Sequence, residues 1–144
     1  MRGIGRVAVA TATVLGVSLC MGLALAGEPA QKSIRNGVFT AEQVAAGKQV
    51  FADVCSECHT SDTFGPDYME GWAGATVGEL FAELQATMPY ESPGTLEDVE
   101  YASVIVYLFS MNGVAAGESE LPTDVTALYD INIEGPFTWN GSNR

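Results

Sequence analysis

Apolar residues recur three and four positions apart in three segments of the chain, a pattern typical of helices that bury one face. The first segment begins at a capping box, Thr40 to Gln43, and continues toward Cys55. The second begins at another capping box, Thr76 to Glu79, and ends at Met88, because a residue that precedes proline is disfavoured in a helix. The pattern therefore predicts two helices that begin at threonine caps.

The third apolar segment is predicted to be a helix between Thr95 and Gly113. Thr95 is the expected N-cap, three acidic residues follow it near the positive helix end, and Gly113 is the expected C-terminal glycine. The β-branched run at 104–106 would suit a strand, but both end signals and a length of about 17 residues favour a helix. No segment has a convincing strand pattern, so we expect an all-α fold with long loops.

Residues 1–26 have the parts of a secretory signal peptide in the usual order. Two arginines precede a long apolar stretch, and Ala24–Ala26 is a small-residue cleavage site. Cleavage after Ala26 predicts an exported, periplasmic protein. A retained membrane anchor is one alternative, because Val7–Ala26 is long enough to span a bilayer, and a lipoprotein modified at Cys20 is another.

The remaining chain divides into three parts by composition. Residues 27–39 are expected to be a polar leader, residues 40–113 the folded domain, and residues 114–144 an acidic extension packed on that domain. Loops of about 10 to 15 residues in so small a domain call for an explanation, and a ligand that they wrap is one.

Charge narrows the set of binding partners. The 144 residues include 6 basic and 18 acidic ones, and removal of residues 1–26 leaves four basic residues and a net charge of −14. Binding to nucleic acid or to anionic lipid needs a positive surface, so neither is expected. We also expect no stable membrane insertion after cleavage.

The chain's chemistry is concentrated in the pentapeptide Cys55-Ser-Glu-Cys58-His59. This is the spacing used for covalent attachment of a c-type haem. Two thiols about one helical turn apart can each add to one haem vinyl group, and the histidine that follows can bind the iron. Because His59 is the only histidine, a second histidine ligand and a second haem of this type are excluded within the chain.

Three other interpretations of the two cysteines are weaker. A thioredoxin-like redox site would need a βαβ context, which the helical pattern does not provide. A closed zinc site needs four ligands, whereas the mature chain has two cysteines and one histidine to offer. A disulfide across two residues would close almost no loop and would stabilise little.

A second iron ligand would come from one of the mature methionines. Met111 ends the apolar face of the third predicted helix and is expected to be core. Met88 stands where the second helix stops, held extended by Pro89, so its side chain can project from a loop. Met88 is therefore the favoured ligand, with Met69 or an open iron position as alternatives.

These residues resemble class I cytochrome c over positions 40–113. The resemblance implies three main helices wrapped around one covalently bound haem, with His59 and Met88 as iron ligands. It implies contact of Gly47 and Phe51 with an aromatic residue of the last helix, identified here as Tyr107. It also implies a hydrogen bond from the His59 ring to the Pro66 carbonyl.

Two aromatic residues are candidates for contact with the haem. Trp72 could donate its indole N–H to a propionate, and Tyr90 adjoins the methionine loop; plain packing is the alternative for both. Tyr68 is expected only to pack.

The loop from Met88 to Gly94 resembles that of small cytochromes serving periplasmic dehydrogenases of alcohols and sugars. The function expected is that of an electron carrier, not an enzyme, which meets redox proteins that have a basic docking patch. The alternatives are a haem subunit fixed to a dehydrogenase or oxidase, and a gas-binding sensor if Met88 does not bind the iron.

Overall fold

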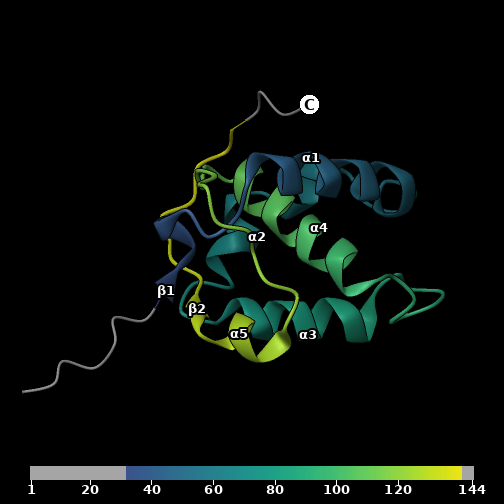
Figure 1. The fold of residues 1–144 in the computed structure, drawn as a ribbon. Coiled ribbons are helices and arrows are strands. Elements are labelled where there is room, and N and C mark those ends of the chain that lie inside the picture. Colours follow the sequence, from purple (N-terminus) through teal and green to yellow (C-terminus); the bar gives the residue numbers. More distant parts are fainter. Residues whose placement is uncertain (1–31, 141–144) are drawn as a thin grey trace, which may run out of the picture.

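The computed structural model describes residues 32–140, so the predicted signal peptide at residues 1–26 lies outside the part described. Three helices form the body: α1 (Ala41–Val50), α3 (Val77–Thr87) and α4 (Asp98–Met111). Helix α4 lies between the other two and packs against both (Figure 1). The fold is mainly helical, which confirms the all-α class.

Both predicted capping boxes are present. The Thr40 hydroxyl accepts from the Gln43 backbone N–H, and the Gln43 side chain accepts from the Thr40 N–H. Thr76 and Glu79 make the same reciprocal pair at the start of α3. The hydrogen bonds that Glu79 accepts from the Thr76 backbone, and secondarily from its side chain, hold the pKa of Glu79 below its ordinary value.

The predicted N-cap of the third helix is wrong. Helix α4 begins after Glu97, whose N–H donates to the Glu100 carboxylate, while Thr95 turns its hydroxyl to the Ser92 carbonyl. An acidic pair therefore makes the capping box in place of the threonine. The predicted end is confirmed, because Gly113 follows the helix with a φ of 79°.

The long loop after His59 has local structure that its sequence did not indicate. It contains a 3-10 turn, η3 (Ser61–Phe64), and a short helix, α2 (Pro66–Glu70), with Pro66 in the first turn where a missing N–H costs nothing. Helix α1 also continues into a π-helical turn, η2 (Phe51–Cys55), which carries the chain to the first cysteine.

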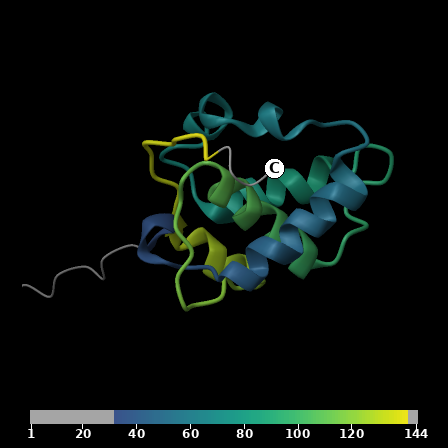
Figure 2. The same ribbon diagram turned by 90° about the horizontal axis from the view of Figure 1, so that it is seen from above.

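The leader and the C-terminal extension meet each other. Strand β1 (Lys32–Ser33) pairs in parallel with β2 (Ile131–Asn132), although no strand was expected, and a 3-10 turn, η1 (Ile34–Asn36), follows β1. A short helix, α5 (Val125–Tyr129), precedes β2 and packs against α3. Figure 2 shows the extension running along one side of the helical body.

Side chains from both terminal segments belong to the core. Ile34 and Phe39 of the leader are fully buried, as are Leu128 and Ile133 of the extension. Arg35 fastens the two segments, because its guanidinium donates to the carbonyls of residues 113, 134 and 136 and lies 5.3 Å from the centre of the Phe137 ring. The leader is thus part of the folded body from residue 32 onward.

Helix α4 is the centre of the core. Residues 101–109 are all buried, as expected of a helix that is apolar on every side. The predicted aromatic contact with α1 is confirmed, because the ring centroids of Phe51 and Tyr107 are 5.5 Å apart. Within residues 32–140, no helix is long and apolar enough to cross a membrane.

Candidate cofactor site

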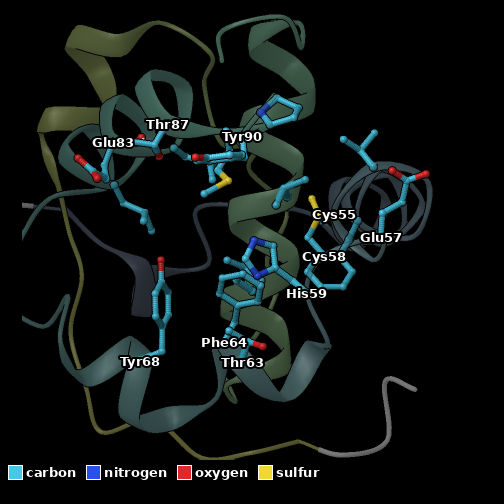
Figure 3. A pocket seen from close by; sticks show the side chains of 18 of the residues that line it. Cys55, Glu57, Cys58, His59, Thr63, Phe64, Tyr68, Glu83, Thr87 and Tyr90 are labelled. Atoms are coloured by element: carbon cyan, nitrogen blue, oxygen red, sulfur yellow. The ribbon is translucent and has the colours of Figure 1, made fainter. Parts of the chain in front are cut away.

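A cavity of about 680 Å³ lies between the η2 turn, the segment that follows the cysteines, helices α3 and α4, and the loop that begins at Met88. Helix α4 contributes Val104 and Leu108 to its lining. In the view of Figure 3, Thr63, Phe64 and Tyr68 lie on one side of the cavity, and Glu83, Thr87 and Tyr90 lie on the other. The cavity joins residues that are far apart in sequence.

Both cysteines and the histidine of the pentapeptide line this cavity. The π-helical turn brings Cys55 to its edge, and the N–H groups of Cys58 and His59 both donate to the Cys55 carbonyl, at 3.2 and 2.9 Å. Cys55 is half-buried, and this burial raises the pKa of its thiol, whereas Cys58 is exposed. Both thiols are free and therefore open to attachment of a ligand.

The geometry gives no support to two of the three competing uses of these cysteines, the disulfide and the zinc site. Cys55 and Cys58 do not form a disulfide. Among residues 32–140, no group of three or more His, Cys, Asp or Glu side chains is placed to hold a metal ion. A zinc site would require its ligands to converge on one point. Cys55, Cys58 and His59 share a cavity but are not placed in that way.

The His59 ring packs against an aromatic series on its side of the cavity. Its centroid lies 5.1 Å from that of Phe64 at an angle of 62°, and Phe64 lies 5.1 Å from Tyr68 in an edge-to-face contact. Phe64 also meets Phe51 of η2 at 5.9 Å. These contacts limit the orientations open to the His59 ring.

Met88 lines the cavity from the end of α3. Its backbone is extended, with φ of −128° and ψ of 152°, as expected before a proline. The Met88 carbonyl accepts from the Tyr101 hydroxyl at 2.7 Å and from the Gly94 N–H at 3.3 Å. Met69 and Met111, in contrast, are buried in the core and are not part of the cavity lining.

Of the three other predicted haem contacts, Pro66, Trp72 and Tyr90, the structure places two at the cavity. Trp72 and Tyr90 line the cavity, Trp72 partly buried and Tyr90 83% exposed at its mouth. Pro66 is not a lining residue, and within residues 32–140 the His59 ring makes no hydrogen bond to its carbonyl. Helix α2 takes Pro66 as its first residue, so the proposed bond stays a prediction without geometric support here.

Sequence reasoning missed several lining residues. Tyr68 was expected only to pack, yet its hydroxyl points into the cavity (Figure 3). Nothing local marks it, because two short helices interrupt the periodicity around it. Glu83 and Thr87 could have been found, since their spacing of four puts them on one side of α3 beside Leu84.

The charge at the cavity is of one sign. Among the described residues, 32–140, its lining includes four acidic side chains and neither lysine nor arginine; the acids are Asp53, Glu57, Glu83 and Glu91. Most of the remaining lining is apolar, so the cavity is an apolar hollow with acidic residues along it.

Comparison with known families adds to this geometry. The family model described as cytochrome C oxidase, cbb3-type, subunit III matches residues 42–108, a span that includes the pentapeptide and Met88. These residues are a cytochrome c domain. No curated protein and no solved structure gives a significant match to the chain.

A cytochrome c domain binds haem c covalently, with iron at the centre of the haem. The site fits that group on its own terms: two free thiols and an imidazole line one apolar cavity, whose volume is within the range of about 300–1,000 Å³ found for cofactor sites. The two thiols would hold the haem, and His59 would bind the iron. A cytochrome c domain indicates an electron carrier rather than an enzyme.

Proposed function

We propose that this cytochrome is a periplasmic, monohaem carrier of class I, which takes one electron at a time from a dehydrogenase or another donor to a respiratory acceptor. The observation that carries the proposal is that His59 and Met88, 29 positions apart in sequence, line the same cavity as the two free thiols. When bound, the haem supplies the one-electron redox chemistry.

Each residue then has a simple task. Cys55 and Cys58 hold the group covalently, so that it is not lost in an exported protein. His59 is the first iron ligand, and the neutral, soft sulfur of Met88 is the second, which favours the ferrous state and raises the reduction potential. Apolar side chains on α4 exclude water, and no residue needs to transfer a proton.

We propose that its redox partners dock with a basic patch. The mature chain has a net charge of −14, and the described part of the chain supplies four acids but no lysine or arginine to the cavity lining. Electron-transfer contacts are small and brief, so long-range attraction determines much of their rate. The resemblance of the Met88 loop favours a periplasmic alcohol or sugar dehydrogenase as one such partner.

A second candidate is a haem subunit that stays attached to an oxidase or dehydrogenase. The observation that favours it is the family model itself, which describes a subunit of an oxidase. A permanent subunit would need a large and apolar interface, and a free carrier would not.

Purification of the native protein under mild conditions separates the two candidates. A free carrier is expected to elute as a small haem protein that a separately purified dehydrogenase reduces rapidly. Co-elution with the subunits of an oxidase or dehydrogenase through successive columns would favour the attached subunit instead. Identification of the reducing protein then names the donor.

A further inference from the structure

Helix α4 places one buried hydrogen-bond donor near each of its ends, and the two donors reach different loops. Near its start, the Tyr101 hydroxyl donates to the Met88 carbonyl at 2.7 Å. At its C-cap, Nδ2 of Asn112 donates to the Phe64 carbonyl at 2.7 Å and to the Leu108 carbonyl at 2.9 Å. Exposed fractions are 1% for Tyr101 and 0% for Asn112, so both donor residues are buried, while the acceptors on the two loops are only partly buried.

These two loops carry the two proposed iron ligands. Tyr101 acts on the Met88 backbone directly. Asn112 acts on His59 through Phe64, whose ring lies 5.1 Å from the His59 ring. Asn112 lies eleven positions after Tyr101, which along an α-helix is a rise of about 16 Å.

The side chain of Asn112 is costly to keep. Its Oδ1 is buried and has no hydrogen-bond partner within residues 32–140, and an unpaired buried acceptor destabilises the fold. A leucine of similar size would avoid that cost. The amide therefore contributes to the fold through the two hydrogen bonds from Nδ2. Of these, the bond to the Phe64 carbonyl links α4 to another segment, whereas the bond to Leu108 stays within the helix.

We infer that α4 is a rigid spacer that sets the position of the His59 loop through Asn112 and of the Met88 loop through Tyr101. Burial on every side holds the helix itself in place. This inference rests on the proposed function, in which His59 and Met88 are the iron ligands. Tyr101 and Asn112 are positioning residues, because neither lines the cavity.

The Met88 side is tested with Tyr101→Phe in the holoprotein. The variant keeps the ring and its edge-to-face contact with Phe81 but removes the hydroxyl, so the Met88 carbonyl keeps only the longer bond from Gly94. We expect cyanide to displace the methionine of the ferric protein about two- to tenfold faster, the range that one net hydrogen bond gives. The His59 ring-proton resonances of the ferrous protein should stay unchanged.

The His59 side is tested with Asn112→Leu. We expect its His59 resonances to shift and its reduction potential to change, while the rate of cyanide entry stays at the wild-type value. If this variant does not fold, Asn112→Ser takes its place, because a serine hydroxyl is too short to reach the Phe64 carbonyl. Ser103→Ala is the matched control, since Ser103 is a buried donor on α4 whose hydroxyl donates to the Val99 carbonyl of the same helix.

The inference is refuted if Tyr101→Phe leaves the rate of cyanide entry at the wild-type value, or if Asn112→Leu leaves the His59 resonances unchanged. A fall in thermal stability alone would not support it. It is also overturned if Ser103→Ala shifts either signal as much as the two variants do. Failure of the proposed function looks different. In that case the wild-type protein itself lacks a covalently bound haem or the optical signature of methionine ligation.

Discussion

Gly47 of α1 touches the backbone of α4 at Ser103: a Cβ placed on Gly47 would lie 1.8 Å from the Ser103 carbonyl oxygen. The neighbouring contact between Phe51 and Tyr107 continues the same crossing one turn farther along. No side-chain rotation can relieve a contact between backbones. Glycine therefore allows α1 to pack on α4 at a distance that brings the cysteines to the cavity.

Gly47→Ala should lower the free energy of unfolding by more than the about 1–3 kcal/mol that overpacking a core usually costs. The added methyl group would force α1 away from α4 and pull η2, the turn that follows α1, away from the cavity. Thermal unfolding followed by circular dichroism measures the loss. Ala46→Ser, at an exposed position of the same helix, is the control and should unfold near the wild-type temperature.

The haem should stay with the polypeptide in acid and organic solvent. Mass spectrometry is expected to show a chain that starts at Gly27 and carries one haem. In Cys55→Ala or Cys58→Ala, the remaining thiol could form only one bond, so less haem should stay attached after denaturation. Complete extraction of the haem from the wild-type protein would refute covalent attachment.

Met88→Ala should abolish methionine ligation. We expect loss of the weak red absorption band of the iron–sulfur bond, a lower reduction potential, and binding of added cyanide or carbon monoxide. Met69→Ala and Met111→Ala are the controls: both side chains are buried, so each change should cost about 2–5 kcal/mol of stability and leave the band in place. An unaltered spectrum in Met88→Ala would point to another ligand or to an open iron.

The reaction with the physiological partner should slow steeply as salt is added. Between about 10 and 150 mM ionic strength the screening length falls from about 30 Å to about 8 Å, which removes long-range attraction. Substitution of Glu83→Gln with Glu91→Gln, both at the cavity, should flatten this dependence. The pair Glu118→Gln and Glu120→Gln, exposed on the C-terminal extension, should not. A flat profile in the wild type would mean that docking is mainly apolar.

The capping box at Thr76 should contribute stability that depends on pH. Because the folded state holds the pKa of Glu79 below its ordinary value, the unfolded chain binds its proton more readily. The contribution is thus fully present above the ordinary carboxyl pKa and is lost as the pH falls through the lower folded pKa. Glu79→Gln should lower the unfolding temperature at pH 7 and have less effect near pH 3. An equal effect at both values would exclude the charged carboxylate as the cause.

Much of this protein could be predicted from its sequence because the signals are local. A capping box needs only four consecutive residues, so the starts of α1 and α3 were predicted correctly at Thr40 and Thr76. The pentapeptide at Cys55 is likewise complete within five positions, so the sequence alone predicted the attachment of a haem. The extended conformation of Met88 follows from the proline after it.

Tertiary structure decided what depends on residues distant in sequence. The leader and the extension join the core because β1 and β2 pair and Arg35 bridges them, contacts that span about 100 positions and leave no periodic trace in either segment. The sequence could rank Met88 above Met69 but could not place it at the cavity. That placement depends on α4, whose Tyr101 donates to the Met88 carbonyl and whose Asn112 donates to the carbonyl of Phe64, the neighbour of His59. A single hydrogen bond between residues distant in sequence has no local sequence signal, so only the packed helices determine where the two loops lie.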